Sequence, residues 1–321
     1  MSVRERPLHL AILGCGAIAG RHARTIRRLD PEVRVGFASR DGVRAALFVR
    51  NHGGFEAWGS YAAALADRRV DAVLIATPPV AHLDLTLSAL AAGRHVIVEK
   101  PAFMRSGDVD MVAAAAAAAG REVLVAENYC YKPLADLLRA IVTSGELGEV
   151  LFVDVRALKR VVRDDWRNDA AVAGGGALFE GGVHWIDLVA HLGLTVESVQ
   201  GFRPGSLEGI ERSMLVVLQY DEGAVGILHH SWEVPALLRG IQLSRIAGTR
   251  GSVTFESNGV FAFVRGRRTR FLVPGLRDIG GFRAMFADFF AVLRTGCAPR
   301  MTLERARTDL ALVEAAYGGT P

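Results

Sequence analysis

Short apolar runs alternate with helical stretches over residues 1–128 of this chain. Nearly continuous apolar strands separated by helices are typical of a parallel sheet covered by helices on both faces. The pattern predicts strands at 8–13, 33–39, 70–76, 95–99 and 123–128. It predicts helices at 17–28, 43–51, 82–92 and 106–119.

The pattern changes after Asn128. The next elements that it predicts are a helix at 133–144, a strand at 150–158 and a helix that follows Gly174–Gly176 and runs to about 192. Strands then follow without intervening helices, at 197–201, 214–220, 224–232, 241–247 and 252–256. This indicates an antiparallel or mixed sheet. The tail returns to helix at 282–295 and 303–317, and these helices are candidates for packing back on the first domain.

Length and composition limit the alternatives. A chain of 321 residues, half of them hydrophobic, suits two domains with a core each. The net charge of +4 comes from scattered arginines and not from a basic patch with aromatics, so we expect no nucleic-acid partner. We expect no membrane span, because no long apolar run lacks charges or turn formers. Three distant cysteines indicate free thiols in a reducing cytoplasm.

Lysine is scarce: of 38 basic residues only Lys100, Lys132 and Lys159 are lysines. Arginine does not lose its proton in proteins, whereas lysine is a compact donor whose proton affinity can be tuned. Lys100 follows the apolar run at 95–98, and a lysine at the end of a buried strand is a candidate for chemistry. We attribute no such role to the other two.

The loop after the first strand reads Gly14-Cys15-Gly16-Ala17-Ile18-Ala19 and fits the pattern G-x-G-x-x-A. In a strand–turn–helix context, Gly14 permits the tight turn and Gly16 lets the backbone approach a pyrophosphate at the helix N-terminus. The motif, including Ala17 and Ile18, predicts a dinucleotide site.

The end of the second strand discriminates between the two nicotinamide cofactors. NAD enzymes place a carboxylate there, whereas this chain has Ser39 and Arg40, which would bind a 2′-phosphate. Asp41 comes slightly later and is a candidate cap for the next helix. The sequence therefore predicts NADP(H) as the preferred cofactor, with NAD(H) as the alternative.

Several further motifs make the chain similar to the Gfo/Idh/MocA oxidoreductase family over nearly its whole length. Besides the glycine loop, the motifs are Ala76-Thr77-Pro78-Pro79 with His82, Glu99-Lys100-Pro101, Gly174-Gly175-Gly176 with Leu178, His184 with Asp187, and Ile246-Ala247-Gly248-Thr249 with Gly251-Ser252. The resemblance implies an α/β protein with a doubly wound Rossmann domain (1–128) and a C-terminal α/β domain (129–321) that has a large open, mostly antiparallel sheet. It also implies a homodimer or homotetramer.

The resemblance also implies site residues. Cofactor contacts would come from the loop with Thr77, Pro78 and His82, and from Glu99. The family lysine corresponds to Lys100 and its histidine to His184. Glu180 stands where the family has aspartate, which puts the substrate class in doubt more than the reaction type.

These residue types indicate hydride transfer at a carbinol carbon. An imidazole such as His184 accepts the hydroxyl proton near neutral pH, and an ammonium group such as Lys100 stabilises the developing alkoxide. Glu180 would orient the substrate or the imidazole. Candidate substrate contacts are Trp166, Arg167, Tyr129 and Asp187, and Asn128 stands where a strand end would meet the nicotinamide or the substrate.

We therefore expect an NADP(H)-dependent oxidoreductase acting on a secondary alcohol or ketone of a sugar, sugar derivative or cyclitol. One alternative is a glycosidase that oxidises its sugar transiently, and another is a non-catalytic regulator that responds to a dinucleotide. We expect no metal, because His184 and Asp187 lack a third ligand at convincing spacing and His191 is too far round the helix. The sequence does not identify the sugar or the direction of the reaction.

Overall fold

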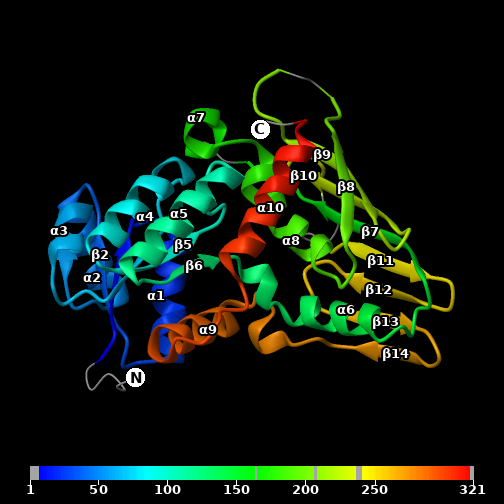
Figure 1. The fold of residues 1–321 in the computed structure, drawn as a ribbon, viewed down its shortest axis with the longest axis horizontal. Helices are drawn as coiled ribbons and strands as arrows, with labels where there is room; N and C mark the ends of the chain where they lie inside the picture. Colours follow the sequence, from blue (N-terminus) through cyan, green and yellow to red (C-terminus); the bar gives the residue numbers. More distant parts are fainter. Residues whose placement is uncertain (1–6, 163–164, 206–207, 236–240, 319–321) are drawn as a thin grey trace. The chain divides into compact units, whose positions relative to one another are not determined.

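The computed structural model describes residues 7–162, 165–205, 208–235 and 241–318 (Figure 1). It divides into two compact units, each made of two stretches of chain. The first unit contains Met1–Glu127 and Phe282–Arg307, and the second contains Asn128–Gly281 and Thr308–Pro321.

The first unit is built on a six-stranded sheet in the order β3-β2-β1-β4-β5-β6, with every pair of neighbours parallel. The strands are β1 (His9–Leu13), β2 (Arg34–Ala38), β3 (Ala57–Trp58), β4 (Ala72–Ile75), β5 (His95–Glu99) and β6 (Val123–Ala126). This is the doubly wound order, in which ligands bind beyond the carboxyl ends of the strands where the order reverses.

Six helices belong to this unit, five of them between the strands. They are α1 (Ala17–Leu29), α2 (Gly42–His52), α3 (Tyr61–Ala66), α4 (His82–Ala91), α5 (Ser106–Ala119) and α9 (Phe282–Thr295). The helix α1 packs against α2 and α9, and α4 packs against α5. Phe286 and Phe289 of α9 are fully buried, so a helix from the C-terminal part of the sequence contributes to the core of this unit.

The second unit is built on an eight-stranded sheet in the order β14-β13-β12-β11-β7-β10-β9-β8. Only β7 and β10 are parallel neighbours, and every other pair is antiparallel. The strands are β7 (Val150–Leu158), β8 (Val196–Phe202), β9 (Ser213–Tyr220), β10 (Val225–Ser231), β11 (Leu243–Gly248), β12 (Ser252–Glu256), β13 (Ala262–Arg265) and β14 (Thr269–Leu272). One face of this sheet meets α8 and the segment before it.

Helices of the second unit are α6 (Pro133–Thr143), α7 (Ala170–Ala173) and α8 (Val183–Ala190), while α10 (Leu303–Ala316) begins in the first unit and ends in the second. The helix predicted after the glycine run is not a continuous α-helix, because Leu178–Gly182 forms a π-helical turn before α8. A Cβ at Gly181 would lie 3.2 Å from Nε1 of Trp232, and one at Gly182 would lie 2.6 Å from Cδ1 of Leu178. The packing of this turn on Trp232 and on its own Leu178 therefore favours glycine at both positions.

The structure confirms the predicted α/β class, with a parallel Rossmann sheet and a mostly antiparallel second sheet. The sequence missed the short β3 and α3, and it extended the sixth strand to Asn128, whereas Asn128–Tyr131 form a 3-10 turn. None of the helices in the described part of the chain has both the length and the hydropathy needed to span a bilayer. All three cysteines are free thiols.

Candidate functional site

The glycine loop of the first unit forms a cradle open to the outside. Gly14 has φ 107° and donates its N–H to the Ala38 carbonyl at 2.9 Å. A Cβ at Gly14 would lie 2.7 Å from the carbonyl oxygen of Ala76, so only glycine fits beside β4. A Cβ at Gly16 would have no neighbouring atom within 4 Å among the described residues.

The start of α1 fits an anion. Gly16 is its N-cap, no side chain caps the helix, and its first turn contains no acidic residue. The first amides of a helix have no partner within the helix and carry partial positive charge. Exposed Ala17 and half-buried Ile18 begin the helix. Open space above Gly16 and these amides together fit the pyrophosphate of a dinucleotide.

The end of β2 is followed by Arg40 and by one carboxylate, that of Asp41. Asp41 caps α2, because its Oδ1 accepts from the N–H groups of Val43 at 2.9 Å and Arg44 at 3.3 Å. Arg44 donates from Nε to the Cys15 carbonyl at 2.9 Å, which links α2 to the glycine loop. Ser39 is buried and accepts the N–H of Asp41, while exposed Arg40 interacts with the hydroxyl of Tyr61.

His82 joins the two loops that follow β4 and β5. Its ring is fully buried, with Nδ1 2.9 Å from the Pro101 carbonyl and Nε2 2.9 Å from the Thr77 carbonyl. Burial lowers the pKa of this imidazole, against the raising effect of those carbonyls. His82 therefore links the two loops that carry Pro78 and Lys100, both of which are half-buried. The hydroxyl of Thr77 is buried without a hydrogen-bond partner among the described residues.

Glu99 pairs with His22, a residue that was not predicted from the sequence to belong to the site. Nε2 of His22 lies 2.5 Å from Oε1 of Glu99, and Oε2 of Glu99 accepts the N–H of Lys100 at 3.0 Å. Burial acts to raise the pKa of Glu99, but the hydrogen bonds and charges of His22 and Lys100 together outweigh it, so the pKa is lowered. The only local signal for His22 is its place on the buried face of α1, beside Ala19 and Ile26.

In the second unit, His184 on α8 stacks on Tyr129. The ring centroids are 4.5 Å apart and the planes differ by 10°. Nζ of Lys132 lies 4.1 Å from the centre of the same Tyr129 ring, and Trp185 meets its edge. Tyr129 therefore orients the imidazole of His184 by ring stacking. Asn128, which is nearly buried, donates from Nδ2 to the Gly280 carbonyl at 2.6 Å.

Glu180, Arg167 and Trp166 form a second cluster. Nε of Arg167 lies 2.9 Å from Oε1 of Glu180, and its Nη1 lies 2.8 Å from Oδ2 of Asp165. The guanidinium also lies 4.3 Å from the centre of the Trp166 ring. The glutamate that departs from the family pattern is thus paired with an arginine 13 residues earlier in the chain.

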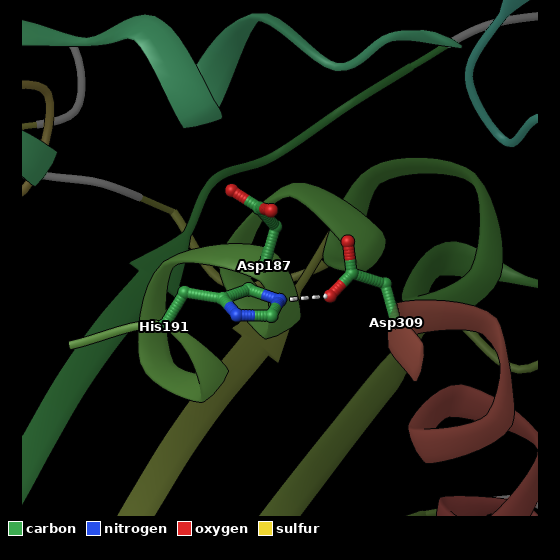
Figure 2. A group of neighbouring side chains, drawn as sticks. All are labelled: Asp187, His191 and Asp309. Carbon is green, nitrogen blue, oxygen red and sulfur yellow. Dashed lines mark hydrogen bonds and ion pairs between the residues drawn. The ribbon is translucent and has the colours of Figure 1, made fainter. Parts of the chain in front are cut away.

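Asp187 is fully buried on α8 and faces His191 and Asp309 (Figure 2). Nε2 of His191 lies 2.9 Å from Oδ1 of Asp309. One carboxylate oxygen of each aspartate and one ring nitrogen of His191 all lie within 4.8 Å of one another. His191 was predicted to lie too far round the helix to join His184 and Asp187 in a metal site. Asp309 is 118 residues away in sequence, so spacing along the chain gave no sign of the group.

Two family descriptions match most of the chain. Residues 8–127 match the description "Oxidoreductase family, NAD-binding Rossmann fold", and residues 136–254 match "GFO/IDH/MocA C-terminal domain". The chain belongs to the Gfo/Idh/MocA family. The resemblance inferred from the motifs is therefore confirmed.

Members of the Gfo/Idh/MocA family that resemble this chain include enzymes with named substrates. D-xylose 1-dehydrogenase (NADP(+)) 2 of Haloferax volcanii is 27% identical over 317 residues, which cover 95% of each chain. Trans-1,2-dihydrobenzene-1,2-diol dehydrogenase of Xenopus tropicalis is 27% identical over 78% of this chain and 76% of its own. The crystal structure of GenD2 from gentamicin A biosynthesis in complex with NAD superimposes with a TM-score of 0.84 at 27% identity, covering 99% of this chain and 95% of that one.

Proposed function

We propose that this protein is an NADP(H)-dependent oxidoreductase that transfers a hydride between the nicotinamide and a secondary alcohol or ketone of a sugar, sugar derivative or cyclitol. The observation that carries the proposal is the uncapped N-terminus of α1 beneath the open space at Gly16, which fits a dinucleotide. Membership of an oxidoreductase family and similarity to a D-xylose 1-dehydrogenase support a sugar-like substrate.

The preference for NADP(H) is supported by the charges at the end of β2. Oδ1 of Asp41 caps α2, so this carboxylate is held towards the helix amides, while Ser39 and Arg40 stand at the end of β2 itself. Arg40 is exposed, and Arg44 is anchored to the glycine loop through Cys15. We propose that Ser39, Arg40 and Arg44 bind the 2′-phosphate, since guanidinium groups recognise phosphate by paired hydrogen bonds.

This preference is tested by fluorescence titration of the purified protein with NADPH and NADH. We expect tighter binding of NADPH, and we expect Arg40→Ala and Arg44→Ala to weaken NADPH binding at least tenfold while changing NADH binding little. Arg50→Ala, at the far end of α2, is the matched control. Equal affinities for the two nucleotides in the unmodified protein would overturn the preference.

The two units supply different groups to the proposed reaction. When bound, the nicotinamide donates or accepts the hydride. We propose that Lys100, at the end of β5, donates a hydrogen bond to the reacting oxygen, and that His184 accepts the proton of that oxygen during oxidation. Stacking on Tyr129 keeps the imidazole in one plane, which is the orientation a general base needs.

The cluster of Glu180, Arg167 and Trp166 is our proposed contact region for the substrate. An aromatic face and a paired carboxylate and guanidinium suit a polyol, because ring carbons stack on indole while hydroxyl groups accept from arginine and donate to carboxylate. Pairing with Arg167 also fixes the direction of the Glu180 carboxylate. Asp187 is fully buried beside His191, so we propose that it supports α8 from behind.

The experiment that tests the function is a screen of aldoses, polyols and nucleotide sugars with both nucleotides, read at 340 nm. Once the screen has identified a substrate, Lys100→Ala and His184→Asn should each lower kcat by about 10²–10⁴-fold. His9→Asn, at the amino-terminal edge of the first sheet, is the matched control. Unchanged kcat in both variants, with substrate turnover intact, would refute the assignment.

The uncovered face of the second sheet supports assembly into a homo-oligomer. Strand register places Phe152, Arg245, Phe263 and Phe271 on one face, and the three phenylalanines are 61%, 43% and 64% exposed. Exposed apolar surface of this kind is typical of protein interfaces. We propose that a second copy of the chain covers it. Light scattering should give a dimer or tetramer, and Phe263→Asp should reduce the mass towards that of one chain.

A further inference from the structure

The helical segment that carries Glu180 and His184 is capped by residues far away in sequence. Its first three amides donate out of the segment. Ala177 donates to the backbone carbonyl of Glu211 at 2.9 Å, and Leu178 donates to Oε1 of Glu211 at 2.6 Å. Phe179 donates to the hydroxyl of Tyr317 at 3.2 Å. The next amide, that of Glu180, donates to the Gly176 carbonyl at 3.0 Å, so helical bonding begins there.

The Glu211 carboxylate is the centre of this cap. Its Oε1 also accepts from the Tyr317 hydroxyl at 2.8 Å, so both partners converge on one oxygen. Only 4% of Glu211 is exposed. Its Oε2 lies against Gly176, where a Cβ would overlap it. Glycine at position 176 is therefore required by the carboxylate that caps the helix.

The surroundings of Glu211 make its charge sensitive to pH. Burial raises the pKa of Glu211 to about 7, although the N–H of Leu178, the Tyr317 hydroxyl and the charge of Arg203 all lower it. Tyr317 and Arg203 are the titratable and charged groups that face it, and burial raises the pKa of Tyr317 as well, so the phenol keeps its proton. An ionised carboxylate accepts hydrogen bonds about twice as strongly as a neutral acid.

We propose that Glu211 is a positioning residue, which with Tyr317 fixes the start of the helical segment that carries Glu180 and His184. This rests on the proposed function only for the roles of those two residues. Because burial raises the pKa of Glu211, its loss of hydration outweighs the stronger hydrogen bonds of the ionised form, and ionisation makes the first turn easier to open. The segment is then best ordered when Glu211 is protonated.

Hydrogen exchange tests the cap without a substrate. The amides of 177–179 are followed by mass spectrometry in the full-length protein between pH 6 and pH 9. At pH 6, where Glu211 is protonated, Tyr317→Phe should exchange about tenfold faster than the unmodified protein, the size expected for loss of a helix cap, and Glu211→Gln should differ little from the unmodified protein. Between pH 6 and pH 8.5 the protection of these amides should fall in the unmodified protein and stay constant in Glu211→Gln, which has no carboxylate to ionise. Glu256→Gln, which removes another buried carboxylate of the same unit, is the matched control.

The pH profile of turnover tests the positioning. The ratio of kcat in the unmodified protein to kcat in Glu211→Gln should fall by about tenfold through pH 7, since the effects of groups that both proteins share cancel. The same ratio measured in the Tyr317→Phe background should fall at a higher pH, because the lost phenol bond no longer lowers the pKa of Glu211. Nucleotide affinity should stay within twofold, because the glycine loop belongs to the other unit.

Equal exchange at 177–179 in all proteins would overturn the cap. Faster exchange with a flat kcat ratio would show a bond that stabilises but does not position, and would overturn the proposal equally. If Glu211→Gln does not fold, Tyr317→Phe decides by the same two measurements. If the unmodified protein turns over no sugar, the proposed function fails while the exchange data still decide on the cap.

Discussion

Removal of His22 should destabilise the first unit strongly, because it leaves a buried carboxylate without its main partner. His22 is fully enclosed and Glu99 is 7% exposed, with Nε2 and Oε1 2.5 Å apart. Breaking a buried pair from one side costs about 3–5 kcal/mol. His22→Leu keeps the contact with the rings of Phe282 and Phe286, so the loss is electrostatic and not one of volume. That cost is a large part of a typical domain's stability when the total is about 5 kcal/mol, and about a third or less when it is about 15 kcal/mol.

The assay is urea unfolding followed by hydrogen exchange of peptides from β1 and β5, which report on this unit alone. Glu99 has a lowered pKa in the folded state, so its stabilisation is present above the unfolded value of about 4.5 and is lost as the pH falls below it. The deficit of His22→Leu should therefore shrink as the medium is acidified. The double variant His22→Leu/Glu99→Leu should lose less than His22→Leu alone, because no orphaned charge remains. A loss below about 1 kcal/mol, or a double variant that equals the sum of the single ones, would refute the reasoning.

Three further outcomes follow from the second unit and the glycine loop. Gly176→Ala should abolish the hydrogen-exchange protection of the amides at the start of the π-helical turn and lower the melting temperature sharply, because its Cβ would overlap the Glu211 carboxylate. A melting temperature within 2 °C of that of the unmodified protein, about the shift that 0.5 kcal/mol produces, would contradict this. The pKa of Glu211 rises on folding, so between pH 4.5 and about 7 the folded state holds a proton that the unfolded state has lost. The free energy of unfolding should therefore fall by about 3 kcal/mol as the pH rises through that window. Glu211→Gln should remove this pH dependence. Gly14→Ala should lower nucleotide affinity more than tenfold in a fluorescence titration, since φ is 107° there and a Cβ would lie only 2.7 Å from the Ala76 carbonyl oxygen. Unchanged binding would count against the role of this loop.

Much of the fold could be predicted because its signals are local. The bounds of β5, α5, β7, β12 and α9 were predicted to the residue. In α5 a helix-forming alanine run ends at Gly120, which takes the left-handed conformation that closes a helix. The order of apolar runs also predicted a parallel sheet covered by helices on both faces, and the family resemblance implied that it is doubly wound. Two-residue β3 was missed because so short a run has no detectable periodicity.

The candidate site could be predicted only in part. Residues next to a recognisable loop or strand end, such as Gly16, Arg40 and Lys100, were named from the chain alone. His22, Asp309 and Glu211 were not, because their partners lie 77, 118 and 33 residues away in sequence. Pairing Glu180 with Arg167 likewise depends on how the segment before the glycine run folds back.

The sequence by itself determined the strand and helix order, the glycine cradle for a dinucleotide and the family, since each depends on residues adjacent along the chain. Only the tertiary structure decided which charges are buried together and which side chains hold the working groups in place. The physical reason is that hydrogen bonding and desolvation act over a few ångströms of space, and that proximity arises between residues for which the order of amino acids shows no periodic or motif signal.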